Sequence, residues 1–159
     1  AIRESCPATG IEVLIPDFQG NEAALDMVFR ARPDVLNHNV ETVPRLYVPV
    51  RPQANFGQSL RVIARARQAG LITKSGMMLG LGEEMAEVRE AIKQLREAGC
   101  DILTLGQYLQ PAPENLQVAR YVHPDEFAEL KAFALALGFA KVDSGPLVRS
   151  SYHAEDVLR

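Results

Sequence analysis

Short apolar runs alternate along this chain with longer amphipathic segments. The apolar runs have the length and composition of buried strands, and they occupy residues 11–15, 35–40, 72–79 and 102–105. The amphipathic segments repeat apolar residues at three- and four-residue spacing, which predicts helices over residues 21–31, 59–69, 85–98 and 124–137. Helix signals agree, because Asn21 and Pro124 stand at helix starts and Gly70, Gly99 and Gly138 directly follow helices.

The succession of strand and helix predicts an α/β fold. Four β-α units in a row favour parallel strands joined by right-handed crossovers. In such folds, functional sites form at the carboxyl ends of the strands. The proline-rich stretch over residues 110–118 is predicted to be a surface loop, since patterned sequence resumes directly after it. With 159 residues the chain can form one core, but a complete TIM-type barrel takes roughly 250 residues.

Composition and charge narrow the class of partner. The chain is 47% hydrophobic and 23% charged, with a formal net charge of −3. This mild acidity argues against a nucleic acid as the main partner. No apolar run approaches the roughly 20 residues that span a bilayer, so no membrane partner is expected. The two cysteines are far apart in sequence, which favours a reducing compartment.

Five sequence motifs occur in a fixed order. They are N-H-N-V-E at residues 37–41, K-S-G-M-M-L-G-L-G-E at 74–83, L-T-L-G-Q-Y-L-Q-P at 103–111, R-Y-V-H-P-D-E-F at 120–127 and R-S-S-Y-H-A at 149–154. In this order they resemble the C-terminal portion of lipoyl synthases, which are radical S-adenosylmethionine (SAM) enzymes. The resemblance covers about residues 11–156. It implies a partial (β/α)6 radical SAM barrel, with the last four β-α units in residues 1–140 and an auxiliary-cluster tail in residues 141–159.

The resemblance implies two [4Fe-4S] clusters and SAM as cofactors of the whole enzyme. A radical SAM cluster needs three thiolates in a C-x-x-x-C-x-x-C loop, but this chain has only Cys6 and Cys100. We therefore expect a fragment of a longer protein that is inactive in isolation. Loss of the first two barrel strands would expose a strand edge, which predicts poor solubility or oligomerisation.

Polar side chains at residues 37–41 are the first candidates for SAM binding. Alternation along a strand would place Asn37, Asn39 and Glu41 on one face and His38 on the other. Amides and a carboxylate suit a ribose diol. By resemblance, Asn39 and Glu41 would bind the SAM ribose or amino group, and Asn37 would border the pocket. The alternative is a strand end with polar caps, and His38 is expected to be packed in the core.

Further candidates come from the next strand and its exit. The resemblance implies that Gly80 and Gly82 cradle the adenosine moiety, although G-x-G-E turns are common in β-α loops. Lys74 and Ser75 precede them, and the Lys74 ammonium would meet the SAM carboxylate. Arg51 is another candidate anion contact. The alternative for both cations is an ordinary surface position.

The last strand and the tail carry the remaining candidates. Gln107, Tyr108 and Gln110 would border the adenine or the incoming octanoyl-lysine arm, or else pack and close the barrel mouth. In the tail, the resemblance implies that Ser151, with Ser150 as the second choice, ligates the auxiliary iron-sulfur cluster beside a supporting Arg149. An ordinary serine-rich turn is the alternative.

The function implied by the resemblance is sulfur insertion at C6 and C8 of a protein-bound octanoyl group. Its partners would be octanoylated lipoyl-carrier domains, such as those of 2-oxoacid dehydrogenase E2 or the glycine cleavage H protein, and an electron donor such as flavodoxin or ferredoxin. The expected compartment is the cytoplasm, or the mitochondrion in a eukaryote. Three alternatives stay open: a non-catalytic half barrel that binds SAM or a carrier protein, a sulfur transferase similar to biotin synthase, and a generic β-α domain that binds a phosphorylated metabolite. The missing G-x-x-x-x-G-K-[ST] pattern disfavours the third.

Overall fold

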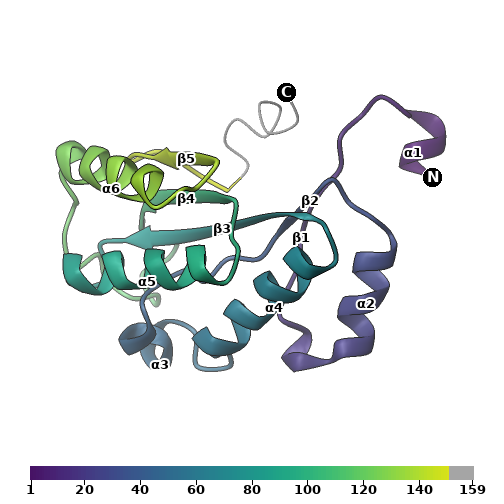
Figure 1. The fold of residues 1–159 in the computed structure, drawn as a ribbon. Helices are drawn as coiled ribbons and strands as arrows, with labels where there is room; N and C mark the ends of the chain where they lie inside the picture. The colour runs from purple at the N-terminus through teal and green to yellow at the C-terminus, as the bar shows by residue number, and fades with distance from the viewer. Residues whose placement is uncertain (151–159) are drawn as a thin grey trace.

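A five-stranded parallel sheet forms the centre of the molecule in the computed structural model, which describes residues 1–150 (Figure 1). The strands lie in chain order and are β1 (Glu12–Leu14), β2 (Val35–Asn37), β3 (Ile72–Leu79), β4 (Ile102–Gln107) and β5 (Lys141–Ser144). Each neighbouring pair is parallel. β1 and β5 are the two edges, so the described sheet is an open part of a barrel.

One short helix precedes the first strand, and the other helices connect the strands. They are α1 (Ile2–Ser5), α2 (Glu22–Arg30), α3 (Tyr47–Val50), α4 (Phe56–Gln68), α5 (Met85–Glu97) and α6 (Pro124–Ala136), with 3-10 turns η1 (Phe18–Gly20) and η2 (Pro44–Leu46). Side-chain caps fix their starts: Asn21 accepts from the amide of Ala24 at 3.1 Å, and Asn55 accepts from the amide of Gln58 at 3.0 Å. The predicted helices and the parallel α/β fold are confirmed.

Two element boundaries and one whole strand differ from the sequence prediction. β2 ends at Asn37 rather than residue 40, and α4 begins at Phe56 rather than residue 59, where Asn55 caps it. β5 was not predicted at all. Its sequence, K-V-D-S, is short and alternates charged residues with one buried valine, and the strand lies at the start of what the sequence assigned to a tail.

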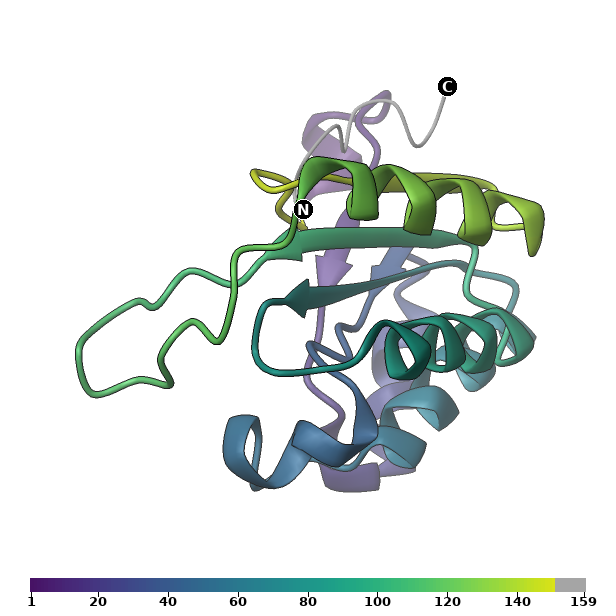
Figure 2. The same cartoon turned by 90° about the vertical axis from the view of Figure 1, so that its left-hand side faces the viewer.

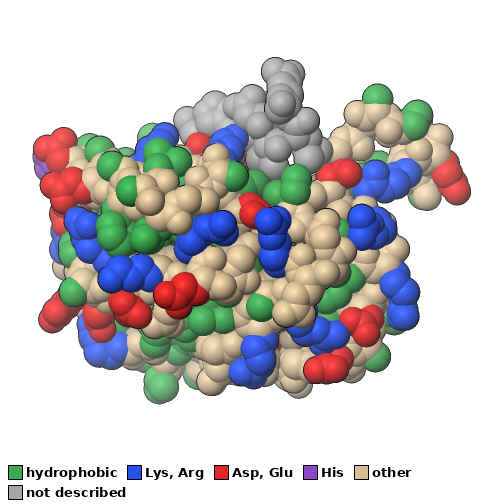
Figure 3. Space-filling model, viewed as in Figure 1, with side chains coloured by type: hydrophobic (Ala, Val, Ile, Leu, Met, Phe, Trp, Pro, Cys, Tyr) green, Lys and Arg blue, Asp and Glu red, His purple; other side chains and the backbone are tan. Residues whose placement is uncertain are grey.

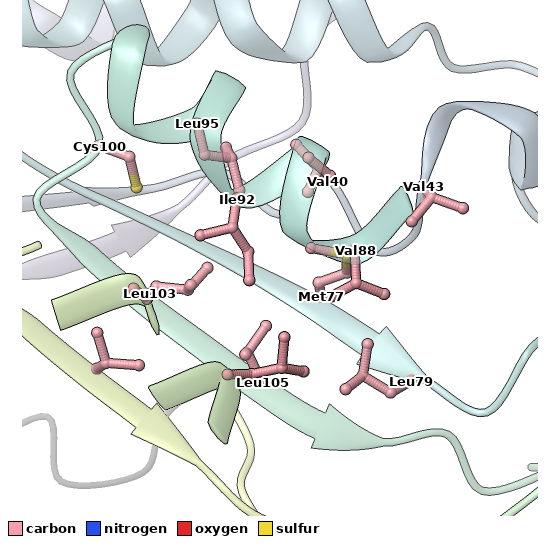
Figure 4. Packing of buried hydrophobic residues seen from close by; sticks show 14 of the residues in the cluster. Val40, Val43, Met77, Leu79, Val88, Ile92, Leu95, Cys100, Leu103 and Leu105 are labelled. Carbon is pink, nitrogen blue, oxygen red and sulfur yellow. The ribbon is translucent and has the colours of Figure 1, made fainter. Parts of the chain in front are cut away.

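The main hydrophobic core lies between one face of the sheet and helices α4, α5 and α6. Figure 4 shows Met77 and Leu79 from β3, and Leu103 and Leu105 from β4, packed against Ile92 and its neighbours from α5. A smaller cluster joins α2 and α4 to the first two strands. The helices therefore cover one face of the sheet, and they leave the opposite face uncovered.

The surface carries mixed charge. Lysine, arginine, aspartate and glutamate side chains are interspersed on the face shown in Figure 3. Across residues 1–150, no helix is both long enough and apolar enough to cross a bilayer.

Candidate functional site

A cavity of about 350 Å³ lies on the sheet face opposite the helices, towards the carboxyl ends of β3 and β4. Polar and small residues from several segments line it, among them Asn39, Glu41, Gly76, Thr104, Gly106 and Arg149. Gly76 pairs with Thr104 across the β3–β4 ladder, so these two residues lie on the same face of the sheet. This is the location at which parallel α/β folds bind ligands.

Glu41 enters the cavity from a left-handed backbone conformation, with φ of +64°. Its amide donates to the carbonyl of Gly76 at 3.0 Å, and its carbonyl accepts from the amide of Met78 at 2.8 Å. Burial raises the pKa of the Glu41 carboxyl, while a hydrogen bond from Asn39 and the charge of Arg51 offset part of that increase. Backbone strain at a non-glycine residue with a partly buried carboxylate is typical of a functional position.

Asn39 presents a buried oxygen that lacks a hydrogen-bond partner. Its side-chain Oδ1 makes no hydrogen bond within the protein. Space beside it is tight, since a Cβ atom on Gly76 would lie 2.9 Å from this oxygen and 2.7 Å from Thr104 Oγ1. Buried polar atoms are nearly always paired. The oxygen is therefore suited to accept from a ligand hydroxyl or ammonium group.

The predicted alternation of Asn37, Asn39 and Glu41 on one strand face is wrong, because β2 ends at Asn37. Asn39 and Glu41 do line one cavity, but a left-handed turn brings them together. Asn37 is buried elsewhere, where its Nδ2 donates to Glu12 at 3.1 Å. His38 is packed as expected, with Nδ1 2.9 Å from the Ile15 carbonyl and Nε2 2.9 Å from Ser59 Oγ.

Arg51 supports the segment that carries Asn39 and Glu41. Its guanidinium donates to the carbonyl oxygens of Asn39 at 3.1 Å and Val40 at 3.0 Å, and it lies 5.3 Å from the centre of the Tyr47 ring. Ser75 supports the same segment, since its Oγ accepts from the amide of Val40 at 3.3 Å. The structure thus gives both residues a positioning role, and their direct contact with SAM stays a prediction.

Lys74 is a buried cation rather than a surface lysine. Its Nζ lies 3.0 Å from both carboxylate oxygens of Glu12, and only 1% of its side chain is exposed. The partner is on β1, at the edge of the sheet. Lys74 does not line the Asn39–Glu41 cavity, and its contact with a SAM carboxylate stays a prediction.

The Gly80–Gly82 exit already holds a carboxylate from its own loop. Glu83, which is buried, accepts from the amides of Gly80 at 2.6 Å and Leu81 at 2.9 Å. Gly80 must lack a side chain, because its φ is +100° and a Cβ would lie 2.2 Å from Gln107 Nε2. In this structure Gly80 permits close packing and Gly82 permits a turn with φ of +106°, and the predicted adenosine cradle stays untested.

The residues that close β4 are engaged with the loop that follows. Gln107 lines the cavity, but its Nε2 donates to the carbonyls of Tyr108 and Arg120 at 3.0 and 3.1 Å. The Tyr108 hydroxyl donates to the Leu116 carbonyl at 2.8 Å, and the exposed Gln110 donates to backbone carbonyls of the same loop. Their contacts match the alternative of barrel-mouth closure; contact with adenine or a substrate arm stays a prediction.

The C-terminal segment crosses β4 and completes the cavity. A Cβ on Gly106 would lie 2.3 Å from the Val148 carbonyl oxygen, so this glycine allows the segment to approach. Arg149 and Ser150 then line the cavity. Ser151, the first choice for a cluster ligand, lies outside the described residues.

Sequence reasoning missed Gly76, Thr104, Gly106 and Met78 as cavity residues. A signal was present, because glycine inside a buried strand often marks the close approach of a ligand or another backbone. Gly76 and Gly106 are both interior to strands, and the register pairs Met78 with Gly106.

The described residues do not fit an iron-sulfur cluster. Within residues 1–150, no group of three or more His, Cys, Asp or Glu side chains is arranged to hold a metal. Cys6 is exposed, whereas Cys100 is buried, and burial raises the pKa of the Cys100 thiol to about 12. The unpartnered Asn39 Oδ1 and the Glu41 carboxyl in the cavity fit the hydroxyl and ammonium groups of SAM, but the thiolates of a cluster are absent from residues 1–150.

The comparison with protein-family models identifies the superfamily to which this chain belongs. Residues 2–95 match the model of the radical SAM superfamily, and the chain belongs to that superfamily. Among solved structures, the radical SAM methyltransferase TsrM from Kitasatospora setae has a similar fold, with a TM-score of 0.57 and 17% identity over 82% of this chain and 26% of TsrM.

The curated relatives of this chain are lipoyl synthases. The lipoyl synthase of Chlorobaculum parvum is 60% identical over 156 residues, which are 98% of this chain and 53% of that protein. The lipoyl synthase of Mycolicibacterium smegmatis is 56% identical over 96% of this chain and 49% of its own length. The predicted likeness to lipoyl synthase is confirmed, and the chain spans about half the length of these relatives.

Proposed function

We propose that this chain is the C-terminal portion of a lipoyl synthase and that the Asn39–Glu41 cavity binds SAM. The observation that carries the proposal is the unpartnered, buried Oδ1 of Asn39 beside a strained Glu41, at the ligand-binding end of a radical SAM sheet. The whole enzyme would insert sulfur at C6 and C8 of a protein-bound octanoyl chain.

Asn39 and Glu41 would hold the polar part of SAM. Asn39 Oδ1 would accept from a ribose hydroxyl or the SAM ammonium. A cation or hydroxyl next to Glu41 would stabilise its ionised form and so oppose the effect of burial on its pKa. Asn37, Arg51, Lys74, Ser75, Gly80, Gly82 and Gln107 would fix or border this pocket. SAM, when bound, supplies the hydrogen-abstracting chemistry, and the protein orients it and excludes water.

Tyr108 and Gln110 would border the path of the substrate arm. The Tyr108 hydroxyl and the Gln110 amide are held by the loop after β4, so these side chains would shape the entrance without changing partners.

The described residues cannot hold either [4Fe-4S] cluster by themselves. The radical SAM cluster needs three thiolates, and Cys6 and Cys100 cannot supply them. In the tail, Ser151, or Ser150 as the second choice, would ligate the auxiliary cluster with support from Arg149. The isolated chain would bind SAM but would not catalyse sulfur insertion.

The partners of the whole enzyme would be octanoylated lipoyl-carrier domains and an electron donor such as flavodoxin or ferredoxin. Its compartment would be the cytoplasm, or the mitochondrion in a eukaryote. A non-catalytic half barrel remains a second candidate, because the cavity stands without a cluster site among residues 1–150.

The test is calorimetric titration of the chain with S-adenosylhomocysteine, which retains the ribose and amino acid of SAM. We expect binding that Asn39→Ala and Glu41→Gln each weaken by about tenfold, the loss of one hydrogen bond to a charged or polar partner. Glu97→Gln, on the exposed side of α5, is the matched control and should bind as the wild type does. Equal binding by all variants would refute the assigned site.

A second test separates the whole enzyme from a cluster-free module. The reading frame upstream of Ala1 should encode C-x-x-x-C-x-x-C and a further cysteine triad. A reading frame that begins near Ala1 would contradict the enzyme assignment and favour the binding module.

A further inference from the structure

A second cleft lies between the turn that follows β1 and the end of α3. Residues 16–19 form one wall of it and residues 50–54 form the other, and we call it the Arg51 cleft. Its volume is about 590 Å³, within the roughly 300–1,000 Å³ typical of small-ligand sites. In Figures 1 and 2, α3 and the segment between β1 and α2 lie at the same end of the molecule. Among the described residues, none lines both this cleft and the Asn39–Glu41 cavity.

The half-buried Arg51 guanidinium has one occupied nitrogen and one unoccupied edge. Its Nη1 donates to the carbonyls of Asn39 and Val40 and to the Tyr47 hydroxyl. Within residues 1–150, Nε and Nη2 have no hydrogen-bond partner, and no carboxylate forms an ion pair with this guanidinium. Arg51 borders the Arg51 cleft and does not line the Asn39–Glu41 cavity. The unoccupied edge is therefore available to a ligand of the cleft.

Asp17 is the second charged residue in the lining of the Arg51 cleft. Both of its carboxylate oxygens are occupied, because Oδ1 accepts from the amide of Gln19 at 2.9 Å and Oδ2 accepts from Gln58 Nε2 at 2.7 Å. One positive and one negative side chain thus line the cleft. Each negative charge on a ligand is attracted by Arg51 and repelled by Asp17. The lining therefore favours a monoanion over a dianion such as phosphate.

Side-chain amides and apolar groups complete the lining. Gln19 and Gln53 are exposed and can donate hydrogen bonds. Phe18 and Gln19 both adopt left-handed backbone conformations, with φ of +48° and +53°, and such strain at residues other than glycine is concentrated at ligand clamps and other functional sites. The apolar lining residues are Pro16, Phe18, Val50, Pro52 and Ala54. The cleft thus combines one cationic edge with amide donors and a mainly apolar surface.

We propose that the Arg51 cleft binds a small organic monocarboxylate whose apolar body packs against Phe18 and Val50. The carboxylate would accept two hydrogen bonds from the Nε–Nη2 edge of Arg51, the planar pairing that a guanidinium makes with a carboxylate. The amide of Gln53 would donate to the same group. This site goes beyond the proposed function, because its ligand binds whether or not the Asn39–Glu41 cavity is occupied.

Phenylacetate tests the charge that the Arg51 cleft requires. It is titrated into the isotope-labelled chain, and the Nε–H resonance of Arg51 is followed by NMR. We expect this resonance to shift with phenylacetate and to stay in place with phenylacetamide, which has a similar shape without the charge. Phosphate should bind at least about tenfold more weakly than phenylacetate. Equal binding of phenylacetamide would overturn the anion site, and phosphate binding as tight as that of phenylacetate would overturn the choice of a monocarboxylate.

A pair of charge variants locates the carboxylate. Gln53 and Gln68 are both exposed, but Gln53 lines the cleft and Gln68 lies at the end of α4. Gln53→Glu should weaken phenylacetate binding at least about tenfold, since the new carboxylate competes for Arg51, whereas Gln68→Glu adds the same charge and should bind as the wild type does. Neither change removes a contact of Arg51, so both variants should fold. Equal affinity in the two variants would place the carboxylate elsewhere.

S-adenosylhomocysteine separates this site from the proposed function. Phenylacetate should shift the Arg51 resonance when S-adenosylhomocysteine is present as it does when it is absent. Mutual exclusion of the two ligands would show that the free edge of Arg51 belongs to the SAM site, and it would overturn a second site. Binding of phenylacetate alone would keep the Arg51 cleft and refute the assigned SAM site. Binding of S-adenosylhomocysteine alone would refute the cleft and keep the proposed function.

Discussion

The left-handed conformation of Glu41 predicts an unusual ranking of two variants. At most positions glycine is less stable than alanine by roughly 0.5–1 kcal/mol because of its greater freedom in the unfolded state. At Glu41, where φ is +64°, a Cβ atom costs roughly 1–2 kcal/mol. Glu41→Gly should therefore be more stable than Glu41→Ala by about 1 kcal/mol, although both lose the carboxylate.

Urea denaturation measures this difference. With an unfolding slope of about 2 kcal/mol per molar urea, typical of a small protein, about 1 kcal/mol moves the midpoint by about 0.5 M. Because both variants lack the carboxylate, the comparison isolates the backbone contribution. A Glu41→Ala midpoint at or above that of Glu41→Gly would refute the inference that this turn is strained. Both variants should lose affinity for S-adenosylhomocysteine, so stability and binding should change in opposite directions for Glu41→Gly.

The Glu41 carboxyl also predicts a pH dependence. Burial raises its pKa in the folded state above the ordinary value of 4.5. The folded state thus binds the proton more tightly than the unfolded state does, and stability should fall as pH rises through the window between the two pKa values. The free energy of unfolding of wild type, measured relative to Glu41→Gln, should decrease from acid to neutral pH. An increase over that range would contradict the burial of this carboxyl.

Three further predictions concern packing and reactivity. Gly106→Ala should destabilise the fold by roughly 1–3 kcal/mol, because its Cβ would meet a backbone carbonyl at 2.3 Å; Gly145→Ala, whose Cβ has ordinary contacts, is the control for urea midpoints. Lys74→Met should cost about 3 kcal/mol by leaving the partly buried Glu12 carboxylate without its counter-ion, with only the Asn37 hydrogen bond remaining, and a loss below about 1 kcal/mol would indicate that the pair is not formed. A thiol reagent should modify Cys6 in the native chain and Cys100 only after unfolding; rapid native labelling of both thiols would contradict the packing.

Much of the fold follows from local sequence. Helical periodicity and caps such as Asn21 place the helices, and the β-α succession gives parallel strands. β5 escaped prediction because its short, charged sequence depends on pairing with β4 for its conformation. Periodicity detects elements that bury a continuous face, and β5 buries only Val142.

The candidate site was predictable in its location but not in its contacts. Asn39 and Glu41 follow a buried strand, so their position at the ligand-binding end is visible in the sequence. The left-handed turn at Glu41 is not, because nothing in the residue type demands it. Nor is the Lys74–Glu12 pair, since it joins strands that are 62 residues apart and depends on the sheet register.

The buried Glu83 has a consequence for the cost of binding. Its carboxylate occupies two loop amides, at 2.6 and 2.9 Å, before any ligand arrives. A loop held by these hydrogen bonds has already lost its conformational freedom on folding. A ligand that contacts the loop therefore does not incur the entropic cost of ordering it. A ligand at this end of the barrel would therefore contact a preformed loop, and the loop would contribute to affinity through shape complementarity.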